Sequence, residues 1–262
     1  GGGREVNKTK IEWCDYTWNP VTGCLHGCPY CYARRIAERF MPKGLGKEDL
    51  EGCFSSDYSR PHGVAFPHGF APTFYHNRID EPKKIKSPSR IFTVSMGDLF
   101  GAWVPMDWKM KVLKTVENCP QHIFLFLTKN PTGYLGLAFP DNAWIGMTVT
   151  KLEHLQVINM DGLAAKTKFV SIEPLLSGPK KPIEFRGIDW IIIGAQTGPG
   201  AVKPRPEWVQ EIINQARTQK IKVFLKDNLK WPEQIQEYPE GCIYETAQGD
   251  GTYLSSAGRK GL

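Results

Sequence analysis

The chain alternates short apolar segments with helix-forming ones, and this alternation restricts the fold more than any other feature. We expect strands at residues 17–22, 90–95, 122–128, 142–150, 168–173, 189–195 and 222–226, and helices at 32–40, 108–118, 153–159 and 206–219. Strands that alternate with helices form parallel sheets. Six or seven strands are fewer than the eight of a full barrel, so the sequence predicts an α/β fold, a partial (β/α)6-type TIM barrel.

The length of 262 residues suits a single domain of this class. Residues 43–72 carry many Gly, Pro, His and Ser residues, so we expect a surface insertion there, and a C-terminal extension after about residue 230. No apolar run reaches the roughly 18 residues of a membrane span, and the N-terminus lacks the apolar stretch of a signal peptide. These features predict a cytoplasmic protein that does not contact a membrane.

Three of the seven cysteines lie within eight residues, in the spacing C-x3-C-x2-C formed by Cys24, Cys28 and Cys31. Disulfide frameworks belong mainly to small secreted chains, so this group indicates metal or redox chemistry. Three thiolates can hold a [4Fe-4S] cluster and leave one iron free for a chelating ligand. Structural zinc is the alternative, since His26 lies inside the motif and zinc prefers four ligands.

Polar residues stand where most of the expected strands end. In βα folds the ligand binds at the carboxyl ends of the strands, so these residues predict a shared active-site rim. The competing interpretation is that polar residues only mark where the strands stop. The segments concerned are 95–98, 128–130, 148–150, 173–174, 195–198 and 226–228.

The cysteine spacing, with an aromatic residue before the last cysteine, resembles the signature of the radical S-adenosylmethionine (SAM) superfamily. Other stretches resemble one phage and bacterial branch of formerly unknown function, related to queuine lyase and distantly to spore photoproduct lyase. They are IEW at 11–13, WNPVTGC at 18–24, FTVSMGDLF at 92–100, FLTK at 126–129, WIGMTV at 144–149, FVSIEPLL at 169–176 and GPGA at 198–201. The chain has AQTG at 195–198 where the branch often has GESG, and KDNL at 226–229 where it often has KQWG.

This resemblance implies a radical SAM fold with two cofactors, a [4Fe-4S] cluster and SAM. In the superfamily SAM binds the open iron through its amino and carboxylate groups. One electron then cleaves it to methionine and a 5′-deoxyadenosyl radical, which abstracts hydrogen from a substrate. The electron would come from a donor such as flavodoxin or ferredoxin.

The residues at the strand ends are then candidates for holding SAM. Asp98 would pair with the ammonium group, unless it caps a helix that begins at Leu99. The remaining candidates are Ser95 and Gly97 beside it, Thr128 and Lys129 for the carboxylate, Thr148 and Thr150 for the ribose, and Gln196 for adenine or substrate. The alternative is that the threonines only favour strand structure and that Lys129 and Gln196 are ordinary loop residues.

The catalytic candidates are Glu173, Lys226 and Cys14. Glu173 ends an apolar strand, where it can accept two N–H bonds from a guanine-like or pyrimidine edge or move a proton; alternatively it forms a salt bridge with Lys226. Cys14 is the candidate hydrogen-atom donor, although an isolated cysteine is usually a small buried apolar residue. That structural role is also expected of Cys53, Cys119 and Cys242.

Three functions remain open on the sequence. The first is a lyase acting on a nucleobase-like molecule, such as a queuine (7-deazaguanine) lyase that releases the cyclopentenediol side chain. The second is repair of a lesion or modified base in DNA, which the net charge of +6 favours and the absence of a recognisable nucleic-acid module disfavours. The third is a non-enzymatic metal-binding module that contacts nucleic acid.

Overall fold

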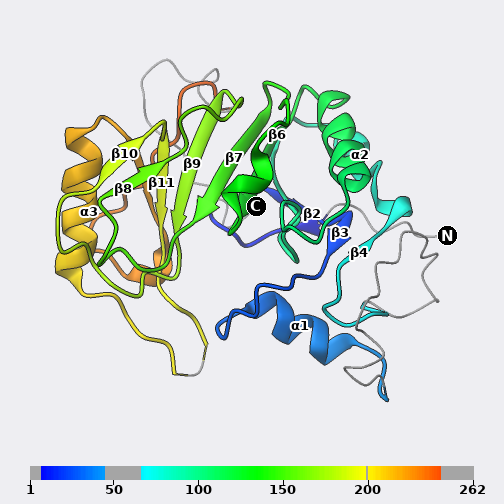
Figure 1. The fold of residues 1–262 in the computed structure, drawn as a ribbon, viewed down its shortest axis with the longest axis horizontal. Coiled ribbons are helices and arrows are strands. Elements are labelled where there is room, and N and C mark those ends of the chain that lie inside the picture. Colours follow the sequence, from blue (N-terminus) through cyan, green and yellow to red (C-terminus); the bar gives the residue numbers. More distant parts are fainter. Residues whose placement is uncertain (1–6, 45–65, 199, 243–262) are drawn as a thin grey trace, which may run out of the picture. The chain divides into compact units, whose positions relative to one another are not determined.

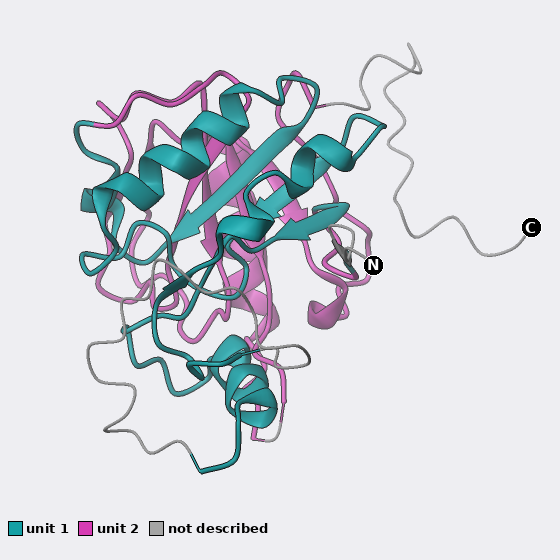
Figure 2. Ribbon diagram, turned by 90° about the vertical axis from the view of Figure 1, so that its right-hand side faces the viewer, with its two compact units in different colours: residues 1–9, 14–136 teal, residues 10–13, 137–262 magenta. Residues whose placement is uncertain are grey.

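The computed structural model describes residues 7–44, 66–198 and 200–242, and the chain forms two compact units. Unit 1 comprises Gly1–Thr9 and Cys14–Gly136, and unit 2 comprises Lys10–Trp13 and Leu137–Leu262 (Figure 2). Each unit contains part of the parallel sheet and its own core. The short segment 10–13 belongs to unit 2 although its neighbours on both sides belong to unit 1.

Unit 1 is built on three parallel strands, β2, β5 and β6, with β1 antiparallel to β2 and a separate antiparallel pair of β3 with β4 (Figure 1). Three short 3-10 helices connect these elements. In chain order the elements are β1 (Asn7–Lys8), β2 (Tyr16–Trp18), β3 (Val21–Thr22), α1 (Tyr32–Phe40), β4 (Thr73–Phe74), η2 (His76–Arg78), η3 (Glu81–Lys84), β5 (Arg90–Thr93), α2 (Met106–Glu117), β6 (Ile123–Thr128) and η4 (Pro131–Tyr134).

Unit 2 contains four parallel strands in the order β7-β9-β11-β12, and a separate parallel pair of β8 with β10. Its helix α3 begins with Pro206, a residue favoured at the first helical position. The elements are β7 (Ala143–Thr148), β8 (Val157–Asn159), β9 (Thr167–Ile172), β10 (Glu184–Arg186), β11 (Trp190–Ile193), α3 (Pro206–Thr218), β12 (Lys222–Leu225) and η5 (Asp227–Leu229).

Aromatic side chains fill the core of unit 2 around the fully buried Trp190. Its ring centroid lies 5.3 Å from that of Tyr238, 5.6 Å from Phe169 and 6.0 Å from Phe224. The indole nitrogen donates a hydrogen bond to the carbonyl of Glu237, which satisfies the polar atom of this buried side chain. All four residues of β11 are buried, as expected for a parallel strand covered on both faces.

The predicted class, a partial α/β barrel of parallel strands, is confirmed. Six of the seven expected strands are present, the one expected at 17–22 is divided into β2 and β3, and α1 spans residues 32–40 as predicted. A bilayer could not be crossed by any helix in the described parts of the chain, because each is too short or too polar.

Several local predictions are wrong. Residues 153–159 do not form a helix, because the alternating burial of Val157, Ile158 and Asn159 suits the strand β8, which pairs with β10. The strand expected at 17–22 is interrupted at Asn19 and Pro20, between β2 and β3. The described connections from β6 to β11 contain no α-helix, so the strand–helix alternation is incomplete.

The surface insertion expected at 43–72 is also only partly correct. Residues 45–65 lie outside the described structure. Phe70 and Ala71 are buried, and Phe70 forms an apolar cluster with Ala33 and Ala37 of α1. The end of this segment therefore belongs to the core of unit 1.

The pKa of the fully buried His122 is lowered, because burial disfavours the charged imidazole, although hydrogen bonds with the backbone of Pro82 and Ile85 oppose this. In the unfolded chain the His122 imidazole binds a proton near pH 6.5, whereas in the folded protein it stays neutral to a lower pH. The free energy of unfolding should therefore decrease as the pH falls from 7 to 5, by up to about 1.4 kcal/mol per pH unit for this group. Urea unfolding of His122→Gln should show a smaller pH slope.

The matched control is His154→Gln, since the His154 side chain is 82% exposed. It should leave the slope of the wild-type protein unchanged. Equal slopes for the wild type and His122→Gln would show that burial of His122 does not govern the acid sensitivity.

Candidate functional site

The cysteine loop leaves β3 and enters α1, and two glycines allow its first residue to pack tightly. Gly23 has a φ of 88°, and a Cβ atom on it would lie 2.2 Å from the carbonyl oxygen of Ala71. A Cβ on Gly97 would lie 2.7 Å from the carbonyl oxygen of Gly23. Side chains at either position would push the loop away, so glycine is required at both. The small size of Gly97 is thus explained by packing within the chain.

The turn after β5 is held against the end of β2. Val94 has a φ of 60°, a strained conformation for a β-branched residue, and its N–H donates to the carbonyl of Trp18 at 2.7 Å. The Asn19 side-chain oxygen accepts from Met96 N at 2.9 Å and from the Ser95 hydroxyl at 3.2 Å. These bonds explain why the predicted strand breaks at Asn19, and they occupy the Ser95 hydroxyl.

Cys24, Cys28 and Cys31 are partly exposed thiols, and none forms a disulfide with another described cysteine. Cys31 caps α1, since its sulfur accepts a hydrogen bond from the Arg34 N–H at 3.4 Å. The Arg34 guanidinium also donates to the carbonyl of Cys24 at 3.2 Å, which ties the first cysteine to the helix.

Burial raises the pKa of the Cys24 thiol to about 12. Cys24 and Cys31 pack against the apolar cluster of Ala33, Ala37 and Phe70, which provides this burial. In the cofactor-free protein Cys24 is therefore protonated at neutral pH, and a metal that binds its sulfur must displace the proton.

The three thiols of the loop are of the chemical type that ligates an iron–sulfur cluster. In the described parts of the chain, no three or more His, Cys, Asp or Glu side chains converge on a point where one ion could bind. In a [4Fe-4S] cluster each thiolate binds a different iron, so the ligands surround one cube and do not meet at one ion. Three thiols on one loop supply the ligands that a cluster with an open iron needs.

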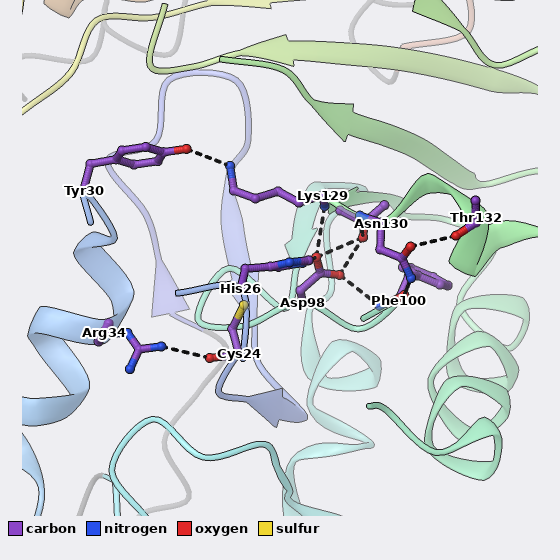
Figure 3. Close-up of polar contacts among 10 residues, drawn as sticks. Cys24, His26, Tyr30, Arg34, Asp98, Phe100, Lys129, Asn130 and Thr132 are labelled. Carbon is purple, nitrogen blue, oxygen red and sulfur yellow. Dashed lines mark hydrogen bonds and ion pairs between the residues drawn. The ribbon is translucent and has the colours of Figure 1, made fainter. Parts of the chain in front are cut away.

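His26, the candidate fourth zinc ligand, instead contacts Asp98. Its Nε2 lies 2.7 Å from Asp98 Oδ2, and its ring packs edge-on against Trp103 at 4.7 Å (Figure 3). An ionised carboxylate only accepts hydrogen bonds, so this imidazole nitrogen donates. The contact joins the cysteine loop to the segment after β5 and disfavours the zinc alternative.

Asp98 is the centre of this arrangement (Figure 3). Its buried carboxylate accepts from the Thr128 hydroxyl at 2.7 Å, from Lys129 N at 3.0 Å and from Phe100 N at 3.0 Å, besides His26. A buried carboxylate is costly unless it is paired in this way. No helix begins at residue 99, so Asp98 caps a turn instead of the expected helix. Asp98 and Thr128, both predicted to contact SAM, are thus hydrogen-bonded to each other, and Asp98 also accepts hydrogen bonds from the backbone.

Lys129 remains the best candidate in unit 1 for an anionic group. Its half-buried ammonium lies 3.3 Å from the Tyr30 hydroxyl and 5.3 Å from the centre of that ring. Tyr30 belongs to the cysteine motif, so Lys129 contacts a residue of that motif (Figure 3). The sequence identified Lys129, but it did not indicate the contact of Lys129 with Tyr30 or the hydrogen bond from Arg34 to the carbonyl of Cys24.

Glu173 and Lys226 form a second polar group, within unit 2. The Lys226 ammonium lies 2.5 Å from Glu173 Oε1 and 3.9 Å from Glu12 Oε2. The salt bridge considered as an alternative is therefore present. Gly194 makes room for it, because a Cβ there would lie 2.8 Å from the Glu173 carboxyl carbon.

Glu12 is a residue of this group that the sequence did not reveal. Burial raises its pKa, while the nearby charge of Lys226 opposes the shift. Its Oε1 accepts from Asp227 N at 3.0 Å, and its Oε2 is buried without a hydrogen bond from the described residues. The resemblance at residues 11–13 (IEW) was the only sequence signal that included Glu12, and it did not indicate a contact with Lys226.

Known sequence families give a match over nearly the whole chain. The family described as "Protein of unknown function (DUF5131)" matches residues 8–253. The chain belongs to this family. A comparison with curated proteins finds no match.

Two solved structures are similar to this DUF5131 member. Spore photoproduct lyase complexed with dinucleoside spore photoproduct has a TM-score of 0.46 at 11% identity, over 84% of this chain and 78% of that one. A cysteine-to-alanine mutant of the same enzyme, also with dinucleoside spore photoproduct, has a TM-score of 0.43 at 12% identity, over 84% and 57%. Likenesses of this size assign neither a substrate nor a reaction.

The remaining predicted residues of the DUF5131 member lie at strand ends or in the core. Thr148 ends β7 and Thr150 follows it, both half-buried, and the Gln196 side chain accepts from Val202 N at 3.2 Å. Cys14, in unit 1, is 3% exposed, as expected of a structural cysteine. Cys119 and Cys242 are buried as well, and Cys53 lies outside the described residues.

The stretches 195–198 and 226–229 contact each other. Asn228 accepts from Ala195 N at 3.0 Å and donates to the carbonyl of Ala195 at 3.0 Å. Residues 195–198 and 226–229 thus form one continuous part of unit 2.

Asp98→Asn should loosen the cysteine loop, since the amide keeps the shape but loses the charge and one acceptor oxygen. Hydrogen bonds to charged groups contribute roughly 1.5–3 kcal/mol each, so we expect the free energy of unfolding to fall by about 2 kcal/mol or more. Hydrogen exchange measured by mass spectrometry should accelerate in residues 23–31.

Asp107→Asn is the control, because the Asp107 side chain is exposed on α2. Exchange in residues 23–31 that is equally slow in both variants would contradict the role assigned to Asp98.

Proposed function

We propose that this protein is a radical SAM enzyme that acts on a nucleobase-like group. The observation that carries the proposal is the loop of three partly exposed thiols, Cys24, Cys28 and Cys31, in the spacing C-x3-C-x2-C. They would hold a [4Fe-4S] cluster, which when bound supplies the electron that cleaves SAM.

The chain's own residues would fix the loop and bind the polar parts of SAM. His26 and Asp98 hold the loop against the ends of β5 and β6, which limits the movement of the thiols. Lys129 presents a cation beside Tyr30, where a carboxylate would be attracted. Further proposed contacts of SAM are Ser95, Gly97, Asp98, Thr128, Thr148, Thr150 and Gln196.

The substrate would be recognised in unit 2 by Glu173 and Lys226. Two carboxylates, Glu12 and Glu173, share a single ammonium, so acceptor capacity remains for the N–H groups of a ligand. The edge of a guanine-like base offers such N–H groups. A queuine lyase that releases the cyclopentenediol side chain is the narrower form of this proposal, and repair of a modified base in DNA is its alternative. Assays with the free base and with a lesion-bearing oligonucleotide separate the two.

Anaerobic reconstitution should yield about four irons and four labile sulfides per chain, as a [4Fe-4S] cluster requires. Cys24→Ala, Cys28→Ala and Cys31→Ala should each abolish this content, while Cys119→Ala, outside the motif, should retain it. The reduced protein should convert SAM to 5′-deoxyadenosine, measured by chromatography. Stoichiometric zinc without sulfide, or SAM that stays intact with a reduced cluster, would refute the proposal.

Glu173→Gln and Lys226→Met should each lower turnover of the nucleobase substrate by about tenfold or more, because a charge-assisted contact contributes roughly 1.5–3 kcal/mol. Iron content and SAM binding should not change. Glu184→Gln is the matched control, since Glu184 forms an exposed pair with Arg186 in the same unit. Normal turnover in both variants, or loss of the cluster in either, would mean that the pair is structural.

A further inference from the structure

Helix α1 uses only one of its faces to fold. Ala33 and Ala37 are buried against Phe70, and the Arg34 guanidinium lies 5.0 Å from the centre of the Phe70 ring. This inner face also contacts Cys24 and Cys31. The helix is therefore anchored to the cysteine loop through this face, and the positions beside Ala33 and Ala37 are not needed for that packing.

The outer face of α1 carries a row of large apolar side chains. Tyr32, Ile36 and Phe40 follow one another at intervals of four residues and are 46%, 39% and 53% exposed. Residues four apart lie side by side on a helix, so the three form a continuous row. The Tyr32 hydroxyl donates to the carbonyl of Ser95 at 2.8 Å, which fixes the start of the row.

Two exposed arginines border this row. Arg35 and Arg39 stand three and seven residues after Tyr32, and the Arg39 guanidinium lies 5.5 Å from the centre of the Phe40 ring. We refer to Tyr32, Arg35, Ile36, Arg39 and Phe40 as the α1 surface. An apolar centre with a charged border is typical of protein interfaces, in which aromatic residues and arginine are enriched.

The α1 surface begins one residue after the third cysteine of the motif, since Cys31 is the N-cap of the helix. A protein bound there would come close to whatever group Cys31 holds. If the thiols hold a redox cluster, as the proposed function requires, this surface lies where an electron must enter.

We propose that the α1 surface docks a small acidic electron-transfer protein that reduces the cluster. The α1 surface carries Arg35 and Arg39, and the helix has a single acidic residue, Glu38, so the surface attracts an acidic partner. The carrier loses one electron and the cluster held by the thiolates gains it, while no bond is formed and no proton is transferred at the surface. Small, weak, electrostatically steered interfaces are characteristic of such redox encounters.

The apolar row favours a protein over a nucleic acid as the partner. A site for single-stranded nucleic acid combines a cationic groove along the phosphates with aromatic side chains that stack on bases. Here the aliphatic Ile36 stands between the two aromatic residues, and the two arginines only border the row. Binding of a nucleic acid to the same surface is therefore an outcome that the experiment must separate.

The test compares Arg35→Glu/Arg39→Glu and Ile36→Ser/Phe40→Ser with the wild-type holoenzyme. Flavodoxin, with its reductase, is the probe, and its binding is measured by biolayer interferometry at two salt concentrations. Each double variant should weaken binding by about tenfold or more, and the charge reversal should also reduce the salt dependence. Flavodoxin-driven formation of 5′-deoxyadenosine should fall, while dithionite-driven formation and iron content stay at the wild-type level.

Lys84→Glu/Lys86→Glu is the matched control, because it changes the charge of unit 1 by the same amount at two other exposed positions. It should bind flavodoxin as the wild type does. Unchanged flavodoxin binding in both α1 variants would overturn the proposal, as would loss of single-stranded DNA binding in place of flavodoxin binding. Failure of the wild type to cleave SAM with dithionite would instead overturn the proposed function, independently of the binding result.

Discussion

The carboxylate of Asp98 is the interaction on which the order of unit 1 depends. It brings together the cysteine loop through His26, the turn after β5 through Phe100, and the end of β6 through Thr128 and Lys129. A charge removed from water in this way is stable only while its donors stay in place, so each bond supports the others. The position of the thiols follows from this network, because their loop has few regular hydrogen bonds of its own.

Close packing adds a second constraint on the same loop. Gly23 and Gly97 approach each other through their backbones, and Arg34 joins the carbonyl of Cys24 to α1. The loop thus lies between a polar network and an apolar cluster. This position buries Cys24 enough to raise the pKa of its thiol, and it leaves all three thiols partly accessible.

Unit 2 also contains a group of partly buried charged side chains, but here two carboxylates surround one ammonium. A single cation, Lys226, stands between Glu12 and Glu173, and the burial that raises the pKa of Glu12 shows that this carboxylate is costly to keep ionised. Gly194 contributes by its lack of a side chain, since the Glu173 carboxylate occupies that space. Such a group can stabilise the unit or bind a ligand, and exchanging the carboxylate for an amide distinguishes these roles.

The sequence by itself determined the features that depend on neighbouring residues. Apolar runs such as 190–193 predict buried strands, and the bounds of α1 were predicted from the sequence as well. Contacts between distant residues were decided only by the tertiary structure. His26 and Asp98 are 72 positions apart, and Glu12 and Asp227 are 215 apart, so no local pattern could pair them. The helix predicted at residues 153–159 is wrong for the same reason, because pairing with β10 outweighs the helical preference of a short segment.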